Sequence, residues 1–415
     1  MNESLPALRR DLEFFPLQHS GQQVILIRDH LGLVQEGKMI APHLYQIMAL
    51  LDGTKTIRDL QMEMMRLKGG VLVGSDEVQS LLTKLDESYL LNSDRFKNAQ
   101  EQMIAEFAAQ KTRPCSHCGR SYPQDPLELK KMLDEILSSQ PQPSKPRERL
   151  VAIVAPHIDP SVGAKVYASA YQMLTSQAPQ RVVVLGTGHQ LADGIFCLTQ
   201  KDFITPFGIV KNANTLTQEL HEAAGGIQAA NDFAHRSEHS IEFQILFLQH
   251  LYSQGTFTII PILCGSLQAN LPEYTRRAYL EKARPFLEKL KKILLDPEKD
   301  TLLVAGVDFS HIGLKFGHDR SAVYLEKQSE IHDNHLLTHL SRLDADKFWE
   351  ESIAVQDRFN VCGFPALACL LEVVSDCQGQ LLGYQLRHEA ITQSAVSFAA
   401  VGFTSRISNF IKEVL

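Results

Sequence analysis

Leu150-Val-Ala-Ile-Val-Ala155, followed at once by Pro156-His157-Ile-Asp159, is the stretch that decides the fold. It is a short, uncharged run of apolar residues, which is typical of a strand buried on both faces. Similar runs follow at residues 181–185, 256–263 and 301–305, with helical stretches between them. Strands that alternate with helices predict an α/β fold, in which a mainly parallel or mixed sheet is covered by helices on both faces.

The bulk composition limits what kind of protein this is. A length of 415 residues suggests two domains or one large one. A formal net charge of −7 argues against a general nucleic-acid binder, because phosphate neutralisation needs clustered Lys and Arg. The seven cysteines are odd in number and spread along the chain, which indicates reduced thiols. With neither a signal-peptide pattern nor an apolar run of roughly 18 residues, we expect a cytoplasmic protein that does not cross a membrane.

Three of the predicted strands run directly into a histidine, namely His157, His189 and His311. The carboxyl ends of parallel strands meet at one rim of a sheet, so the three imidazoles are expected to converge there. One such histidine is most often a loop residue with a backbone hydrogen bond, but three together favour a metal or acid–base site. Asp159 and Asp308 are placed to orient them, because a ligand imidazole usually needs a carboxylate on its other nitrogen.

A cysteine and an acidic turn add to this rim. Cys362 precedes an apolar helix, where the helix dipole favours a thiolate, although a small buried residue is the alternative. Imidazole with thiolate suits iron, copper or zinc, and not magnesium or calcium. Glu238-His239-Ser-Ile-Glu242 begins a helix, and Glu238 or His239 either complements the helix dipole or reaches the pocket as an acid–base or orienting group.

A second cysteine motif, Cys115-Ser-His-Cys118, resembles half of a zinc site. A closed structural zinc site needs a second pair of ligands, which the neighbouring sequence does not provide. We therefore expect exposed reduced thiols here.

The first 95 residues read as a small α+β domain of winged-helix type, followed by a helical linker over residues 96–113. Strands are expected at residues 24–27, 32–34 and 71–73, with three amphipathic helices among them. Thr56 and Asp59 resemble a capping box at the start of the second helix, and Ser75 is expected to cap the third. The third helix carries four acidic residues against one lysine, so phosphate would repel it and peptide or protein contact is favoured over DNA.

Seven segments in the same order resemble the Memo family, in the bacterial form named AmmeMemoRadiSam system protein B. They span about 118–415 of this chain and are Ser121-Tyr-Pro-Gln-Asp-Pro126, Ala155-Pro-His-Ile-Asp159, Leu185-Gly-Thr-Gly-His189, Thr205-Pro-Phe-Gly208, Glu238-His-Ser-Ile-Glu242, Asp308-Phe-Ser-His311 and Cys362-Gly363.

The resemblance implies a domain over residues 114–415 with a fold similar to the extradiol dioxygenase (class III) subunits. It makes the Pro-rich stretch at residues 138–146 an internal loop rather than a linker. It also implies a metal cleft with His157, His189 and Cys362 as ligands, and with Asp308 and His311 beside it.

The resemblance further implies company with a radical-SAM protein and an AMMECR-type protein. Residues 1–95 resemble the PqqD type of peptide-recognition domain, which fits that company.

The leading hypothesis is a non-haem metal-dependent redox enzyme, with iron as the metal and copper or zinc as alternatives. His311 would act as the acid–base group and Asp308 would orient it, with Glu238 and His239 in supporting roles. Two alternatives stay open: a non-catalytic protein that binds a peptide or docks a radical-SAM enzyme, and a zinc hydrolase with Glu238 as its base.

Overall fold

The computed structural model describes residues 4–141, 148–175, 177–252 and 255–405. The chain divides into two compact units, Met1–Ala109 and Gln110–Leu415. The helix expected as a linker is α4 (Asp94–Ala109), and it belongs to the first unit. Its Phe96 ring lies 4.1 Å below the buried Arg9 guanidinium, which explains why it packs with that unit. Residues Thr112–Arg113 are a strand of the second unit.

The first unit combines a three-stranded antiparallel sheet with helices. Its strands are β1 (Leu12–His19), β2 (Gln22–Asp29) and β3 (Met39–Ile40). Its further helices are α1 (Pro42–Met48), α2 (Ile57–Leu67) and α3 (Ser75–Glu87). The three predicted helices and the Thr56–Asp59 capping box are confirmed, although Gly74 rather than Ser75 occupies the N-cap of α3.

Two of the strands predicted in this unit are wrong. Residues 32–34 form a turn instead, because the Asp29 carboxylate accepts hydrogen bonds from the backbone N–H groups of Leu33 and Val34 at 2.9 and 2.8 Å. Residues 71–73 are not a strand, and Leu72 is 83% exposed. The strand β2 pairs with β3 and with β1, which contains Pro16 and was not anticipated. The winged-helix, PqqD-like assignment of the unit stays a prediction.

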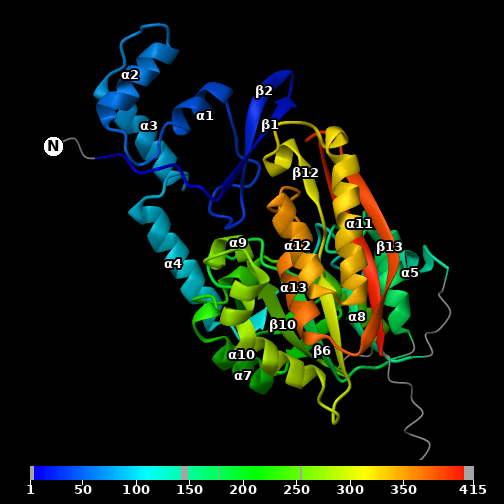
Figure 1. Ribbon diagram of the computed structural model, residues 1–415. Helices are drawn as coiled ribbons and strands as arrows, with labels where there is room; N and C mark the ends of the chain where they lie inside the picture. The colour runs from blue at the N-terminus through cyan, green and yellow to red at the C-terminus, as the bar shows by residue number, and fades with distance from the viewer. Residues whose placement is uncertain (1–3, 142–147, 176, 253–254, 406–415) are drawn as a thin grey trace, which may run out of the picture. The chain divides into compact units, whose positions relative to one another are not determined.

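The second unit is built on one large mixed sheet (Figure 1). The four strands predicted from the apolar runs are confirmed as β5 (Leu150–Ala155), β6 (Arg181–Thr187), β10 (Thr258–Cys264) and β11 (Thr301–Gly306). They are neighbours in the order β5-β11-β6-β10, and each adjacent pair is parallel. Their carboxyl ends therefore share one rim.

The other strands extend this centre. They are β4 (Thr112–Arg113), β7 (Phe196–Leu198), β8 (Asp202–Thr205), β9 (Gly208–Asn212), β12 (His311–Gly313), β13 (Cys377–Glu389) and β14 (Ser394–Ser405). Because β14 runs antiparallel to β5, the sheet is mixed, as expected.

Both faces of the sheet are buried, and alternate residues of each central strand serve opposite faces. On β6, Val183 and Leu185 pack in one hydrophobic cluster, and Val182 and Val184 pack in the other. The first cluster is covered by α7 (Asn214–Ala224), α10 (Arg276–Leu294), α11 (Glu326–Arg342), α12 (Ala345–Val355) and α13 (Phe364–Val373). The second is covered by α5 (Pro126–Ser138), α6 (Ala164–Tyr171) and α8 (Glu242–Leu251). This burial on two sides explains why the central strands are continuously apolar rather than alternating.

Short helical turns complete the unit: α9 (Leu267–Asn270), η1 (Gln172–Leu174), η2 (Gly225–Ile227), η3 (Phe233–Arg236), η4 (Leu314–Phe316) and η5 (Ala322–Tyr324). Of the Pro-rich stretch expected as an internal loop, residues 142–147 lie outside the described residues. Within the described part of the chain, no helix has the length and apolar character needed to cross a membrane.

Candidate metal centre

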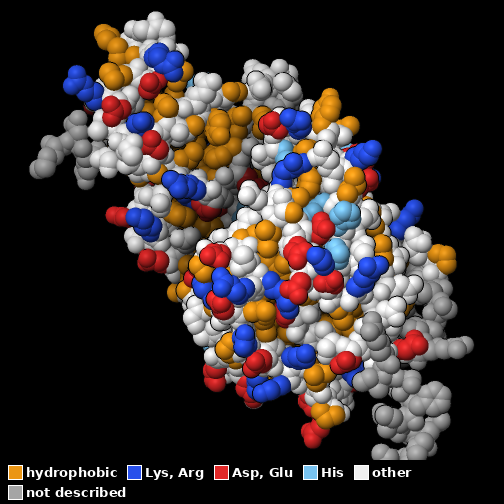
Figure 2. Space-filling view, in the orientation of Figure 1, with side chains coloured by type: hydrophobic (Ala, Val, Ile, Leu, Met, Phe, Trp, Pro, Cys, Tyr) orange, Lys and Arg blue, Asp and Glu red, His pale blue; other side chains and the backbone are white. Residues whose placement is uncertain are grey.

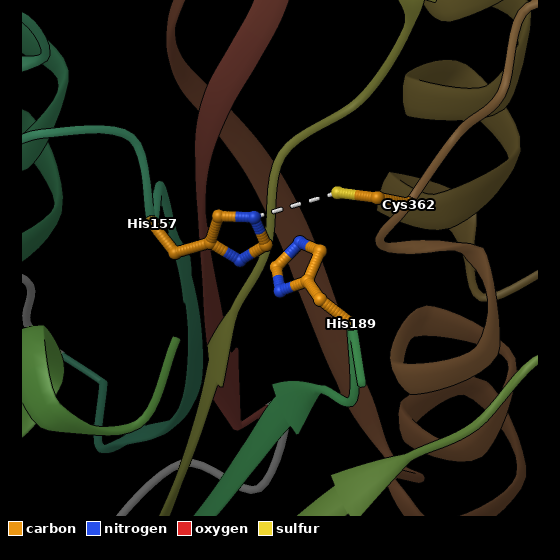
Figure 3. Close-up of side chains that lie close together, drawn as sticks. All are labelled: His157, His189 and Cys362. Atoms are coloured by element: carbon orange, nitrogen blue, oxygen red, sulfur yellow. Dashed lines mark hydrogen bonds between the residues drawn. The ribbon is translucent and has the colours of Figure 1, made fainter. Parts of the chain in front are cut away.

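Three potential metal ligands meet at the rim formed by the carboxyl ends of the central strands. His157 and His189 each lie two residues beyond a strand, β5 and β6, and Cys362 directly precedes the N-cap of α13. One ligand atom of each residue lies within 4.8 Å of the others, and Cys362 Sγ is 3.4 Å from His157 Nε2. Figure 3 shows the two imidazoles and the thiol pointing toward one another.

His157 is held in the form that a metal ligand requires. Its side chain is buried, and Nδ1 lies 3.0 Å from the carbonyl oxygen of Gly306. A carbonyl only accepts, so Nδ1 carries the proton and Nε2 is left facing Cys362. Burial and the nearby His189 lower the pKa of His157 to about 3, so the ring is neutral at physiological pH.

His189 is oriented by a carboxylate. Its Nδ1 lies 3.1 Å from both oxygens of Glu238, and its backbone N–H donates to Glu238 Oε2 at 3.1 Å. Partial burial opposes a charge on the ring, but the Glu238 carboxylate outweighs it and raises the pKa of His189 well above its usual value. With Nδ1 occupied, Nε2 of His189 is the nitrogen that can face a metal.

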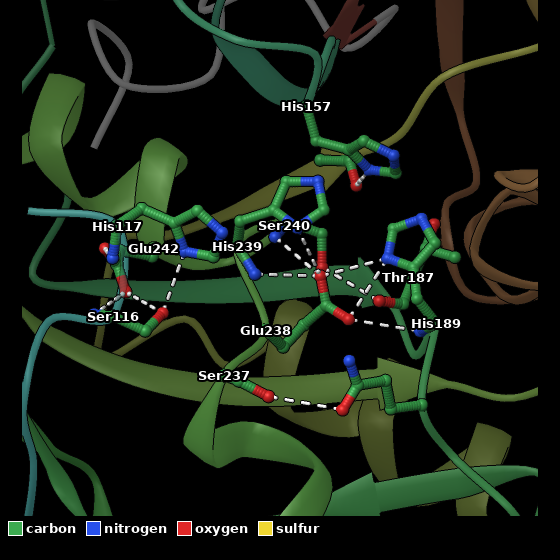
Figure 4. Close-up of polar contacts among 12 residues, drawn as sticks. Ser116, His117, His157, Thr187, His189, Ser237, Glu238, His239, Ser240 and Glu242 are labelled. Atoms are coloured by element: carbon green, nitrogen blue, oxygen red, sulfur yellow. Dashed lines mark hydrogen bonds and ion pairs between the residues drawn. The ribbon is translucent and has the colours of Figure 1, made fainter. Parts of the chain in front are cut away.

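Glu238 is the anchor of this part of the site (Figure 4). Its side chain is 4% exposed, and it also accepts hydrogen bonds from the backbone N–H groups of His239 and Ser240, both at 2.9 Å. Burial would raise its pKa, but His189 and these donors lower it well below the usual value. We had expected Glu238 to begin the helix. The helix α8 begins at Glu242 instead, so Glu238 lies in the turn before it.

The carboxylate expected beside His157 has another role. Asp159 accepts from the backbone N–H and the hydroxyl of Ser161 at 3.0 and 2.6 Å, so it caps a local turn. Glu238 and the Gly306 carbonyl orient the two imidazoles instead.

His239 lies against the ligand cluster. Its ring stacks on His189 with centroids 5.0 Å apart and lies 5.2 Å from His157. His189, Glu238 and His239 form a second possible ligand grouping, but both Glu238 oxygens already accept N–H groups of the chain. We therefore interpret Glu238 as an orienting group.

Asp308 and His311 flank the cluster. Asp308 Oδ1 accepts from the backbone N–H of His157 at 2.9 Å, and burial raises the pKa of Asp308 to about 6. His311 opens β12, and its Nδ1 lies 3.0 Å from the carbonyl oxygen of Phe309. Burial lowers the pKa of His311 to about 4. Of the three rim histidines, the structure groups His157 and His189 with Cys362, and His311 stands beside them.

The thiol of Cys362 does not behave as the helix-dipole argument predicted. Burial raises its pKa despite its position before α13, so the metal-free residue is a thiol. A bound transition metal would displace that proton. Two imidazoles whose Nδ1 atoms are already engaged and one thiol are a donor set that fits iron, copper or zinc.

A fifth histidine, His117, also lies near the site, and the sequence analysis did not predict it there. Its ring lies 5.2 Å from His239 and 5.6 Å from Phe243. It is positioned by Glu242, whose Oε1 accepts the His117 backbone N–H at 2.9 Å and whose other oxygen pairs with the buried Arg113. No local sequence signal pointed to this arrangement, because Arg113 and Glu242 are far apart in the chain.

The Cys115–Cys118 motif flanking His117 differs from the expectation in one respect. Both thiols are half-buried rather than exposed. Neither joins a metal-ligand grouping among the described residues.

A cavity opens beside Cys362. It measures about 170 Å³, and its walls include Thr187, Gly188, Tyr274 and Asp357. Since Thr187 and Gly188 lead directly to His189, this cavity gives a small molecule room next to the ligand cluster.

Comparisons with known proteins agree on one family. The family model "Memo-like protein" matches residues 113–402. A "MEMO1 family protein" of Aquifex aeolicus is 29% identical over 95% of this chain and all of the relative. A second, from Thermus thermophilus, is 26% identical over 82% of this chain and 97% of the relative. The "Protein memo-1 homolog" of Caenorhabditis elegans is 27% identical over 63% of this chain and 71% of the relative.

Proposed function

The chain belongs to the Memo family, and we propose that in this member His157, His189 and Cys362 hold an iron ion at the centre of a redox enzyme. The observation that carries the proposal is the set of three ligand atoms within 4.8 Å of one another. In both imidazoles the second nitrogen is already engaged, by Gly306 and by Glu238. Such preorganisation is what a metal ligand needs and what a loop histidine does not.

The residues around the cluster have distinct tasks. Glu238 holds the His189 ring, and Asp308 holds the backbone of His157. His311 is neutral at physiological pH and donates through Nδ1 to the carbonyl oxygen of Phe309, so Nε2 is the nitrogen that would accept a proton from a substrate. When bound, iron would supply the one-electron chemistry that no side chain here provides.

One feature argues against hydrolytic chemistry, and another concerns the compartment. A zinc hydrolase needs a free general base, but the oxygens of Glu238 accept hydrogen bonds from several N–H groups of the chain. All seven cysteines are free thiols, which suits the reducing cytoplasm, where we place the protein's activity.

The test is elemental analysis of the full chain after anaerobic purification. We expect near-stoichiometric iron in the wild type and its loss in the His189→Ala/Cys362→Ala variant. A His388→Ala/Cys115→Ala variant is the matched control, because it removes one imidazole and one thiol outside the cluster. Equal metal content in all three proteins would contradict the ligand assignment, and stoichiometric zinc or copper would contradict iron.

A second role is favoured by the surface of the first unit. Met62 in α2 and Val71 and Leu72 in the segment after it are 59, 61 and 83% exposed, which is high for large apolar side chains. We propose that they contact a peptide or protein partner, such as the radical-SAM protein or the AMMECR-type protein that the family resemblance suggests. The Met62→Ser/Leu72→Ser variant should bind the purified radical-SAM partner at least tenfold more weakly than the wild type, a loss of about 1.4 kcal/mol. Unchanged affinity would rule out this surface as the contact.

A further inference from the structure

Two cysteines outside the candidate metal centre, Cys115 and Cys118, lie in one turn of the second unit with two residues between them. Both are free thiols and half-buried, and the Cys118 thiol is hydrogen-bonded with that of Cys115. Figure 2 shows acidic and basic side chains mixed over one face of the second unit. The two thiols, by contrast, pack against the hydrophobic cluster that covers one face of the sheet. They are therefore neighbours in partly apolar surroundings.

The turn that carries the two cysteines is held from two sides. The backbone N–H groups of Ser116 and His117, the residues between the cysteines, donate to Glu242 Oε2 and Oε1, each at 2.9 Å (Figure 4). The carbonyl oxygen of His117 accepts from the N–H groups of Arg120 and Ser121 at 3.1 and 3.0 Å. A disulfide requires a specific geometry, so a fixed turn with both thiols already in contact favours one.

A metal site is the other known use of two neighbouring thiols. A structural zinc site needs four ligands, but no grouping of ligand atoms among the described residues contains either cysteine. The imidazole between them is engaged elsewhere, since His117 Nδ1 lies 2.8 Å from Ser116 Oγ and its ring lies 5.2 Å from His239. Two thiols in contact without further ligands are suited instead to dithiol–disulfide chemistry.

We propose that Cys115 and Cys118 form a reversible dithiol–disulfide pair, which exchanges with low-molecular-weight disulfides such as glutathione disulfide. In a reducing compartment, where we place the protein, disulfides are transient and serve catalysis or redox sensing. All seven cysteines are free in the structure, which corresponds to the reduced state of this pair. Burial and the neighbouring Cys115 raise the pKa of Cys118 to about 12, so Cys118 is the second sulfur to react and Cys115 is the first.

The exchange takes place in two balanced steps. The Cys115 thiolate attacks one sulfur of glutathione disulfide, so a bond forms between Cys115 and glutathione, the original S–S bond breaks, and one glutathione leaves as a thiolate. Cys118 then loses its proton and attacks Cys115 Sγ, which forms the protein disulfide and releases the second glutathione. Two protein thiols are oxidised, one glutathione disulfide is reduced, and the two protons pass to the departing thiolates. The second step is eased because a bonded Cys115 no longer raises the pKa of Cys118 through its charge.

The proposal does not rest on the proposed function, because thiol exchange needs no metal, and the test uses the metal-stripped full chain. The chain is equilibrated in glutathione buffers from fully reduced to fully oxidised, the remaining thiols are alkylated, and trypsin is added. Cleavage after Lys111 and Arg120 leaves both cysteines in one peptide, residues 112–120, because Pro114 blocks cleavage after Arg113. We expect this peptide to change from two alkylated thiols to an internal disulfide, two hydrogen atoms lighter than the dithiol, and to return on reduction.

Single variants test the order of the two steps. Cys118→Ser should accumulate a glutathione adduct on Cys115, whereas Cys115→Ser should gain at least about tenfold less adduct in the same time, because a buried thiol ionises less readily. The control is Cys197→Ser, since the Cys197 thiol donates to the Asn231 carbonyl oxygen at 3.4 Å and a hydroxyl can do the same. It should form the disulfide in the 112–120 peptide as the wild type does.

Two results for the wild-type peptide would overturn the proposal. One is a separate glutathione adduct on each cysteine, and the other is two alkylated thiols across the whole range of buffers. Equal adduct formation in Cys118→Ser and Cys115→Ser would overturn the assignment of Cys115 as the attacking sulfur.

Discussion

Two buried glutamates four residues apart, Glu238 and Glu242, give a matched pair of substitutions. One should lower the metal affinity and the other should lower the stability of the fold. Glu238→Gln keeps the shape of the side chain but removes its charge. The N–H donors of His189, His239 and Ser240 face the two Glu238 oxygens. In the glutamine variant, the side-chain NH₂ group that replaces one oxygen must therefore point at one of these N–H donors. The charge-assisted bond to His189 Nδ1 becomes a neutral one.

The size of the effect follows from that exchange. A hydrogen bond to a charged group contributes about 1.5–3 kcal/mol and a neutral one about 1 kcal/mol. The loss of about 1–2 kcal/mol in holding His189 corresponds to a fall of roughly 5–30-fold in metal affinity. That range overlaps the roughly 10–100-fold loss that is typical for removing an orienting carboxylate.

Glu242→Gln should act on stability instead. Glu242 pairs with Arg113, and both side chains are at most 1% exposed. Breaking a buried ion pair costs about 3–5 kcal/mol, because the remaining charge is left uncompensated. Since Glu242 does not contact His157, His189 or Cys362, the metal affinity should change less than about threefold, or ~0.6 kcal/mol.

Competition against a chromogenic chelator measures the metal affinity of each variant, and urea unfolding measures its stability. The reasoning is refuted if Glu238→Gln binds metal as tightly as the wild type. It is equally refuted if Glu242→Gln weakens binding as much as Glu238→Gln does.

Three further substitutions test other parts of the structure. Burial raises the pKa of Asp333 to about 6, so the protonated carboxyl contributes to the stability of the fold at low pH, and this contribution is lost as the pH rises through 6. Relative to Asp333→Asn, the free energy of unfolding of the wild type, measured in urea, should fall by up to about 3 kcal/mol between pH 4 and 7. A difference between the two proteins that does not depend on pH would contradict this. A Cβ on Gly363 would lie 2.6 Å from the Asp308 carbonyl oxygen, so Gly363→Ala should displace Cys362 and lower the free energy of unfolding by about 1–3 kcal/mol. The control is Gly226→Ala, which should leave stability nearly unchanged, because a Cβ on Gly226 would meet no atom within 4 Å. Thr56→Ala removes the α2 capping box and should cost about 1 kcal/mol, seen as faster amide hydrogen exchange in α2 with no change in β5; equal exchange in α2 would contradict the cap.

The central sheet could be predicted because its signal is local. Each of β5, β6, β10 and β11 is a continuous apolar run, and burial on both faces requires that pattern. The rule that strand ends share a rim then predicted that His157 and His189 would lie together. These inferences needed no knowledge of which strands pair.

The features of the fold and the site that were not predicted depend mainly on contacts between residues far apart in the sequence. His117 is positioned by Glu242, 125 residues away in the sequence, and nothing near either residue signals the other. The thiol pKa of Cys362 was misjudged because a helix position is visible in the sequence but the depth of burial is not. The strand β1 was missed because Pro16 interrupts its pattern, although an edge strand tolerates a proline.

The hydrogen bonds around Glu242 also determine where the chain can be cut. The carboxylate accepts from the backbone of Ser116 and His117 and from the hydroxyl of Tyr122, the last at 2.5 Å. The segment that follows the first unit is thus part of the second unit's interior. A truncated chain that starts at Gln110 retains this segment, whereas one that starts after Tyr122 would leave Glu242 buried without its partners. A truncation that removes the first unit should accordingly place its junction ahead of β4.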